Sequence, residues 1–269
     1  MSRITITSLN SEQRDLTTHD GIRFMSFPAG ERHVYLPESV AASNHVHWKV
    51  SAQIYEPADI MDLLLLNNAL RKAAKSIVTT ALFIPYLPYA RQDRLTVPGE
   101  SVSIEVMAQL INSMQFDLVE FADVHSPKSL ALVNNSVSLP ASQFVALVTQ
   151  AEPWRAAPFA VVCPDKGAVA RTNEVAQALG GVPVVYCDKV RNPATGKLSG
   201  MQVVSEVPNM PLLLIDDICD GGGTFLGVGA ELRKLTEQPL YLYVTHGLFT
   251  KGLEALESIF TKIYSPYVK

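Results

Sequence analysis

The sequence has few charged residues, few cysteines and no long hydrophobic run. Charged residues make up 18% of the 269-residue chain, and 22 basic residues against 26 acidic ones leave a net charge of −4. No overall positive field is available to bind a nucleic acid or an anionic membrane. The chain begins without the apolar region of a secretory signal, and its longest apolar run, 60–66, is interrupted by Asp62. We therefore expect no nucleic-acid partner and no membrane span.

The three cysteines, Cys163, Cys187 and Cys219, are single and widely spaced. An odd number without Cys-x-x-Cys spacing argues against a disulfide framework and against a structural zinc site. Each cysteine lies in or beside an apolar stretch, which is typical of a small buried side chain. These absences together predict a cytoplasmic enzyme in a reducing compartment.

What the sequence does contain is a regular alternation of strand-length apolar runs and helical patterns, in a chain that is 48% hydrophobic. We expect strands at 45–50, 77–84, 116–121, 159–163, 182–186, 212–215, 240–244 and 259–264, and helices at 58–72, 104–114, 168–179, 225–235 and 252–258. Strands separated by helices indicate parallel sheets and the α/β class. The first 55 residues suggest short β segments whose pairing stays open. The polar stretch 134–142 marks the expected boundary between two similar domains, 1–138 and 139–269.

The segment 212–225 is the most informative part of the chain. An apolar strand ends in Asp216 and Asp217, and a glycine-rich turn then leads into a helix. The residues of the turn are Asp220, Gly221, Gly222, Gly223 and Thr224. Glycines let backbone N–H groups face a ligand, and with a helix N-terminus they form an anion site. The paired carboxylates can accept hydrogen bonds from sugar hydroxyls, so the segment fits a ribose 5-phosphate. On the residues alone, a turn whose acids cap the following helix is an alternative.

This segment resembles the phosphoribosyl-diphosphate (PRPP) binding signature of phosphoribosyltransferases and ribose-phosphate diphosphokinases. The resemblance implies two phosphoribosyltransferase-like domains, each a mainly parallel sheet flanked by helices, with the ribose 5-phosphate site in the second. Gly221 stands where the family has a hydroxyl residue, which removes one side-chain contact to phosphate.

A second block, 84–94, reads Ile-Pro-Tyr-Leu-Pro-Tyr-Ala-Arg-Gln-Asp-Arg. By itself it fits either an exposed loop with local ion pairs or a polyphosphate clamp formed by its arginines. The block resembles the ATP motif of the diphosphokinases nearly letter for letter, which implies ATP contacts from Arg91, Gln92 and Asp93. It separates a maker of PRPP from a transferase that consumes PRPP.

A third block, 23–31, resembles the family's Phe-x-Asp-Gly-Glu element, which reaches ATP in a neighbouring subunit. The resemblance implies that Phe27 packs on adenine, that Glu31 accepts from it and that the protein is a homo-oligomer with shared ATP sites. Ala29 stands where the family usually has Asp or Asn.

The remaining blocks concern magnesium and the transferring phosphate. The element 123–126 resembles the family's Asp-Leu-His-Ala, and 163–168 its Ser-Pro-Asp-x-Gly-Gly, which makes His125 and Asp165 the expected Mg²⁺ ligands; Mg²⁺ prefers oxygen ligands. The stretch 186–193 resembles the start of the family's catalytic loop and implies that Lys189 and Arg191 stabilise the transition state. Without that context these charged residues fit solvated or structural positions. His45 and His47 have no third ligand, and we expect a structural role.

The resemblance covers nearly the whole chain and identifies a short member of the diphosphokinase family. It implies transfer of the β,γ-diphosphate of ATP to the anomeric hydroxyl of ribose 5-phosphate, giving PRPP and AMP. Two alternatives are a catalytically weak regulatory subunit, which the departures at Ala29, Lys166, Val190 and Gly221 favour, and a PRPP-consuming phosphoribosyltransferase.

Overall fold

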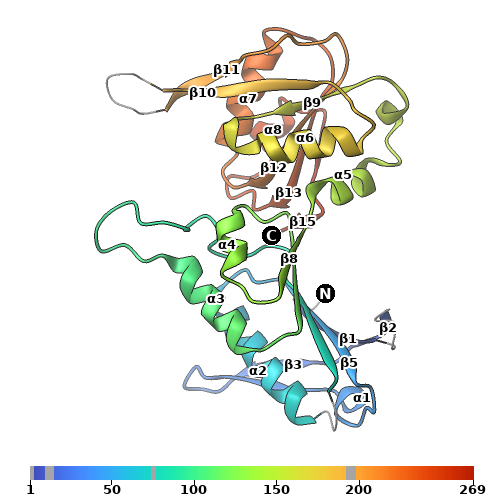
Figure 1. Cartoon of the computed structure of the whole chain (residues 1–269), viewed down its shortest axis with the longest axis vertical. Helices are drawn as coiled ribbons and strands as arrows, with labels where there is room; N and C mark the ends of the chain where they lie inside the picture. Colours follow the sequence, from blue (N-terminus) through green and yellow to red (C-terminus); the bar gives the residue numbers. More distant parts are fainter. Residues whose placement is uncertain (1–2, 10–14, 74–76, 192–197) are drawn as a thin grey trace. The chain divides into compact units, whose positions relative to one another are not determined.

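The computed structural model describes residues 3–9, 15–73, 77–191 and 198–269. Within these ranges, only the backbone is described at 15–16, 191 and 198–199. The chain divides into two compact units, Met1–Leu139 and Pro140–Lys269. Each unit is a sheet with helices packed on it (Figure 1). Within the described residues, no helix has both the length and the apolar character that a membrane crossing requires.

The first unit is built on a six-stranded sheet in the order β2-β1-β5-β6-β7-β8. Strands β5 to β8 are parallel, whereas β1 pairs antiparallel with both β2 and β5. A separate antiparallel hairpin, β3-β4, packs beside helix α2. The elements are β1 (Ile4–Leu9), β2 (Asp15–His19), β3 (Arg23–Ser26), β4 (Arg32–Tyr35), α1 (Glu38–Ala41), β5 (His47–Ala52), α2 (Pro57–Ala73), β6 (Thr79–Phe83), α3 (Ser103–Ser113), β7 (Leu118–Ala122), α4 (Pro127–Ala131) and β8 (Ser136–Leu139).

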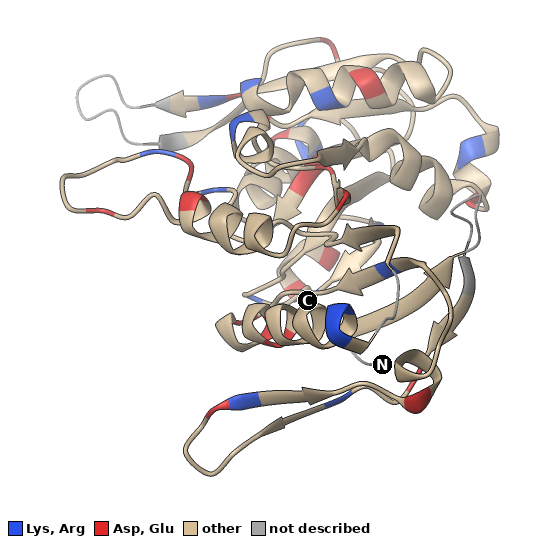
Figure 2. Ribbon diagram, turned by 60° about the horizontal axis from the view of Figure 1, so that its bottom comes forward, with Lys and Arg blue, Asp and Glu red and all other residues tan. Residues whose placement is uncertain are grey.

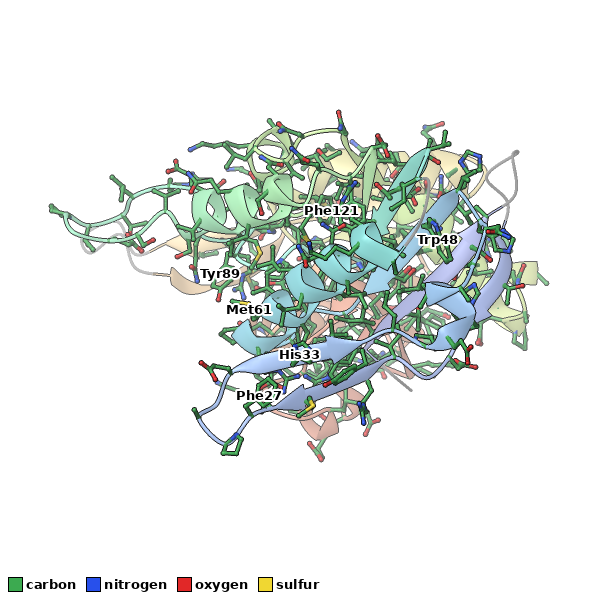
Figure 3. The ribbon with its side chains drawn as sticks, turned by 90° about the horizontal axis from the view of Figure 1, so that it is seen from below. Phe27, His33, Trp48, Met61, Tyr89 and Phe121 are labelled. Atoms are coloured by element: carbon green, nitrogen blue, oxygen red, sulfur yellow. The ribbon has the colours of Figure 1, made fainter. Side chains whose placement is uncertain are left out.

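Helix α2 shows why these residues fold as they do. Pro57 begins the helix, where a missing N–H costs nothing, and Arg71 in the last turn donates to the carbonyls of Met114 and Gln115 at 2.9 and 2.7 Å. Its apolar stripe enters a core that includes the fully buried Trp48 and Phe121 (Figure 3). Burial of this face, rather than helix propensity, holds α2 against the sheet.

The second unit is built on a sheet in the order β11-β10-β9-β12-β13-β14, with β15 also pairing β13. All pairings are parallel except β10–β11. The elements are α5 (Ala141–Thr149), η1 (Pro153–Ala156), β9 (Ala160–Cys163), η2 (Lys166–Ala168), α6 (Val169–Ala178), β10 (Val184–Arg191), β11 (Leu198–Val203), β12 (Leu212–Cys219), α7 (Gly223–Arg233), β13 (Leu240–Gly247), α8 (Glu254–Glu257), β14 (Lys262–Tyr264) and β15 (Tyr267–Val268). The mainly parallel α/β architecture predicted from the strand–helix alternation is confirmed.

Three differences from the sequence-based elements bear on the site or on the domain boundary. Strand β12 continues through Asp216 to Cys219, because its ladder with β13 runs on to the pair Cys219–Gly247. Strand β10 likewise reaches Arg191 because β11 pairs with its second half. The stretch 134–142 is not a plain linker: it contains β8 and the start of α5.

Candidate functional site

The glycine-rich turn of the second unit joins the buried strand β12 to helix α7. Gly222 adopts a left-handed backbone, with φ 75°, and immediately precedes the helix. A β-carbon there would lie 3.3 Å from Cδ2 of Leu256, so both the backbone conformation and the close packing favour glycine. The first N–H groups of α7 have no partner within the helix, as at any helix start. The turn therefore presents backbone donors at the positive end of a helix dipole, which suits an anion.

A second loop fastens this turn. The backbone N–H of Leu248 donates to the carbonyl of Cys219 at 2.8 Å, and that of Thr250 donates to the carbonyl of Asp220 at 3.1 Å. The Thr250 hydroxyl also donates to Oδ1 of Asp220 at 2.8 Å. Because Asp220 is engaged by the loop after β13, the geometry of the turn depends on two adjacent strand ends.

Asp216 and Asp217 lie on β12 just before the turn, and Arg171 of α6 lies beside both. Its guanidinium is 3.3 Å from Oδ1 of Asp216 and 3.5 Å from Oδ2 of Asp217. Burial raises the pKa of Asp216 well above its usual range, the charge of Asp217 adds to that rise, and Arg171 opposes it. The sequence-based predictions did not include Arg171. It is the one arginine of the expected helix 168–179, which follows the 163–168 block, and that position could have indicated a partner for the acids.

Asp165 and Lys189 meet at the carboxyl edge of the same sheet. Asp165 follows β9 and caps η2, where its Oδ1 accepts the N–H of Gly167 at 2.8 Å. Its other oxygen pairs with the ammonium of Lys189 on β10. Lys166 pairs in the reverse sense with Asp188, at 2.9 Å. Strands β9, β10 and β12 are parallel neighbours, so their carboxyl ends bring these groups to the edge where ligands bind in open α/β sheets.

The predicted magnesium and phosphate-transfer residues are only partly described by this arrangement. The side chain of Arg191 and the loop 192–197 lie outside the described residues. The Asp165 carboxylate already pairs with one cation, the Lys189 ammonium. A half-buried carboxylate oxygen is the kind of ligand that Mg²⁺ prefers. In the described part of the chain, no three His, Cys, Asp or Glu residues gather into a site. The donor set thus fits an ion that takes most of its ligands from water or phosphate.

In the first unit, the loop after β6 carries the predicted ATP contacts. Arg91 and Gln92 are exposed, and Asp93 is buried. The Asp93 carboxylate accepts from Nε of Arg94 at 2.8 Å and from the Ser126 hydroxyl at 2.9 Å. These contacts, led by Arg94, lower the pKa of Asp93 to about 2. Asp93 therefore holds the loop to the end of β7, while Arg91 and Gln92 stay accessible to a ligand.

His125 lies in the loop between β7 and α4, which also carries Ser126, and its side chain is exposed. The nearby Asp123 has φ 43°, and Tyr89 in the preceding loop has φ 64°. Left-handed backbone is uncommon for residues other than glycine and is retained where the surroundings fix it. Both loops are therefore held in defined shapes at the carboxyl ends of β6 and β7.

The hairpin β3-β4 presents the turn 27–31. Phe27 is 42% exposed, and its ring lies 5.6 Å from that of His33 on the same hairpin (Figure 3). Glu31 is exposed beside it. The turn is closed by backbone bonds from Phe27 to Glu31 and from Gly30 to Phe27, both 2.8 Å. An exposed aromatic ring and a carboxylate thus share one rigid turn.

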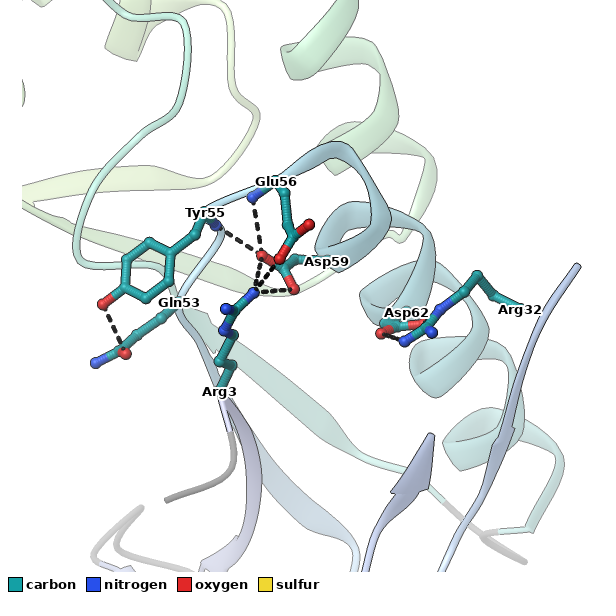
Figure 4. A network of polar contacts seen from close by, with 7 residues as sticks. All are labelled: Arg3, Arg32, Gln53, Tyr55, Glu56, Asp59 and Asp62. Carbon is teal, nitrogen blue, oxygen red and sulfur yellow. Dashed lines mark hydrogen bonds and ion pairs between the residues drawn. The ribbon is translucent and has the colours of Figure 1, made fainter. Parts of the chain in front are cut away.

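The other face of the hairpin is anchored to helix α2. Nε of Arg32 donates to Oδ1 of the buried Asp62 at 2.7 Å, and a second guanidinium nitrogen pairs with the other carboxylate oxygen (Figure 4). A third reaches the hydroxyl of Ser26 at 2.9 Å. One helical turn earlier, Arg3 of the strand-β1 end pairs with Asp59 at 3.2 Å (Figure 4). The position of the turn 27–31 is therefore fixed by a bidentate ion pair.

Basic and acidic residues are interspersed along the ribbon (Figure 2), as the balanced composition predicts. The structure brings Asp165 together with Lys189, and it places Asp216 and Asp217 on β12, separated from the turn 220–224 by Ile218 and Cys219. In the first unit it joins the loop of Asp93 to the loop of His125 through Ser126.

Comparison with known proteins identifies the family. Residues 15–114 match the model of the N-terminal domain of ribose phosphate pyrophosphokinase, and residues 150–245 match the phosphoribosyl transferase domain. The chain is 30% identical over 235 residues to the ribose-phosphate pyrophosphokinase of Mycoplasma pneumoniae, covering 87% of this chain and 68% of that protein. It is 31% identical to that of Thermococcus kodakarensis, over 86% of this chain and 79% of the relative.

A solved structure agrees with this assignment. Phosphoribosylpyrophosphate synthetase from Mycobacterium smegmatis superposes with a TM-score of 0.73 at 26% identity, over 89% of this chain and 77% of that one. The mainly parallel sheets and the glycine-rich turn are consistent with these relatives. This chain belongs to the ribose-phosphate pyrophosphokinase family.

Proposed function

We propose that the protein is a ribose-phosphate diphosphokinase, which transfers the β,γ-diphosphate of ATP to the anomeric hydroxyl of ribose 5-phosphate and releases AMP. The observation that carries the proposal is the turn 220–224 between β12 and α7, with Asp216 and Asp217 on the strand that leads into it. Backbone donors at a helix start suit the 5-phosphate, and the two carboxylates suit the ribose hydroxyls. The family membership adds the reaction.

In the first unit, residues 1–138 form the ATP-binding domain. Arg91 and Gln92 are exposed cationic and amide groups on a loop whose shape Asp93 fixes, and they bind phosphates and nucleotide. Phe27 and Glu31 lie on an anchored, exposed turn and contact the adenine bound by a second subunit, so the protein acts as a homo-oligomer. Supporting this assignment, aromatic side chains, phenylalanine among them, are enriched at protein–protein interfaces.

In the second unit, residues 139–269 form the ribose 5-phosphate domain. The anomeric oxygen attacks the β-phosphorus in line with the departing AMP, and negative charge spreads over the transferring oxygens. Lys189, which pairs with Asp165 at this edge of the sheet, is assigned to stabilise that charge. Arg191 is assigned the same role. Mg²⁺, with Asp165 and His125 as the proposed protein ligands, supplies positive charge to the phosphate oxygens when bound.

Three free, buried cysteines suit a reducing compartment, so we place the reaction in the cytoplasm. The test is to incubate the purified chain with ATP, magnesium and ribose 5-phosphate and to follow AMP and PRPP by chromatography or ³¹P NMR. Equimolar AMP and PRPP, abolished by EDTA and restored by magnesium, is the expected result. ATP that stays intact would favour a regulatory subunit. Diphosphate released from supplied PRPP and a nucleobase would favour a transferase.

A further inference from the structure

The side chain of Lys251 lies over Gly221, in the middle of the glycine-rich turn. A β-carbon placed on Gly221 would be 3.3 Å from Cε of Lys251, 3.4 Å from Cδ and 3.6 Å from Cγ. The aliphatic part of the lysine therefore occupies the space that a side chain at position 221 would enter. The two residues come from the ends of different strands, β12 and β13.

The backbone holds Lys251 in this place. Thr250, its neighbour, bonds to Asp220 through both its N–H and its hydroxyl. Gly252 on the other side has φ 75°, and its N–H donates to the carbonyl of Phe249 at 2.9 Å. A tight turn thus directs residue 251 across the loop that precedes α7.

The ammonium of Lys251 is available to a ligand. The residue is exposed, and the described part of the chain offers it no hydrogen-bond acceptor or carboxylate partner. Lys166, Lys189 and Lys234 of the same unit each pair with a carboxylate instead. Nζ is roughly one 1.5 Å bond beyond Cε, so it lies within about 5 Å of the position that a β-carbon of residue 221 would take.

Acidic residues near the turn make an added positive charge favourable for phosphate binding. Asp216, Asp217 and Asp220 precede or form the turn, and Arg171 is the described cation beside the first two. Carboxylates near the turn repel a phosphate dianion, and backbone amides carry only partial charges. A lysine ammonium is a compact charge suited to a phosphate oxygen.

We propose that Lys251 binds the 5-phosphate of the ribose phosphate substrate, acting across the loop in place of the side chain that Gly221 lacks. The inference rests on the proposed ribose 5-phosphate site and assigns that site a further binding residue. Lys251 contributes to substrate affinity and takes no part in the transfer of diphosphate. Removing the Lys251 side chain is therefore expected to weaken ribose 5-phosphate binding and to raise its KM, while kcat is preserved.

The test compares Lys251→Ala, Lys251→Arg and, as a matched exposed lysine of the same unit, Lys234→Ala. Titration calorimetry measures the Kd of each full-length protein for ribose 5-phosphate and for inorganic sulfate. Lys251→Ala is expected to weaken ribose 5-phosphate binding at least about tenfold, or about 1.4 kcal/mol, with kcat and the KM for ATP within about twofold of wild type. Lys251→Arg keeps most of the affinity, and Lys234→Ala keeps all of it.

A double-variant cycle adds a readout that a merely structural lysine does not produce. Gly221→Ala displaces the Lys251 stem and is expected to weaken ribose 5-phosphate binding in the wild-type background, but to have little further effect in Lys251→Ala. Additive losses would overturn the inference.

The inference and the proposed function fail separately. A wild-type protein that makes PRPP, with an unchanged Kd in Lys251→Ala, overturns the role of Lys251 and leaves the reaction in place. A protein that makes no PRPP but loses ribose 5-phosphate affinity in Lys251→Ala overturns the reaction and supports the role. A wild-type chain that does not bind ribose 5-phosphate overturns both.

Discussion

The ammonium of Lys189, on β10, pairs with the carboxylate of Asp165, at the end of the neighbouring strand β9. The pair places the ammonium proposed to stabilise the transferring phosphate next to the carboxylate proposed to hold magnesium. In this structure each neutralises the other.

Lys189→Ala should lower turnover by at least about 100-fold, because it removes a charge that acts mainly in the transition state. The KM for ribose 5-phosphate should stay within about threefold, since Lys189 is on β10 and strand β9 separates β10 from β12, which leads into the turn 220–224. Steady-state kinetics with both substrates checks this. Lys166→Ala is the control, because Lys166 forms the reverse ion pair with Asp188 and is mostly exposed. Near-normal turnover in Lys189→Ala would contradict the role.

Arg171→Leu should destabilise the protein by about 3 kcal/mol, because it leaves two adjacent, largely buried carboxylates without their guanidinium. Denaturant unfolding measures the loss. Burial already raises the pKa of Asp216, and removing Arg171 raises it further. A carboxyl group with a raised folded pKa stabilises the fold when protonated, and that contribution is lost as pH rises through the folded pKa. The deficit should therefore be larger near about pH 8 than near about pH 5. A pH-independent deficit would contradict this account.

Arg32→Met should raise the KM for ATP by about threefold to tenfold and leave the KM for ribose 5-phosphate unchanged. The reason is that Arg32 anchors the turn of Phe27 and Glu31 to Asp62, and a loosened turn positions the proposed adenine contacts poorly.

The same ion pair makes a stability prediction. Arg32→Met leaves the buried Asp62 unpaired and should cost about 2 kcal/mol, whereas the double variant Arg32→Met with Asp62→Leu should recover most of that loss. Unfolding of the two single variants and the double variant measures the coupling. A double variant as unstable as the sum of the singles would show that the pair does not act as a unit.

Asp93 should make the stability of the protein sensitive to acid. Its folded pKa of about 2 lies below the unfolded value, so its contribution is present above the unfolded pKa and is lost as pH falls toward 2. That contribution is at most about 2 kcal/mol, since its partner Arg94 is largely exposed to solvent. Asp93→Asn should lower stability at neutral pH and flatten the acid limb of an unfolding curve. An unchanged acid limb would contradict the prediction.

Local sequence patterns predicted much of the fold because they act within a few residues. Helix α3 was expected at 104–114 and spans Ser103–Ser113, since its apolar period is local. The end of β12 was expected at 215 and lies at Cys219, because pairing with β13 extends the strand over two carboxylates that have low strand propensity. The pairing of the first 55 residues depended on the antiparallel register of β1 with β5, which no local pattern encodes.

The sequence by itself determined the strand–helix alternation, the glycine-rich turn and the order of the motifs, because each is written in contiguous residues. Only the tertiary structure decided which side chains meet. Arg171 reaches Asp216 across 45 residues, Arg32 reaches Asp62 across 30, and Lys251 lies over Gly221 from another strand end. Such contacts depend on which strands are neighbours and how the helices cross them, and these features arise from packing the whole sheet rather than from any single segment.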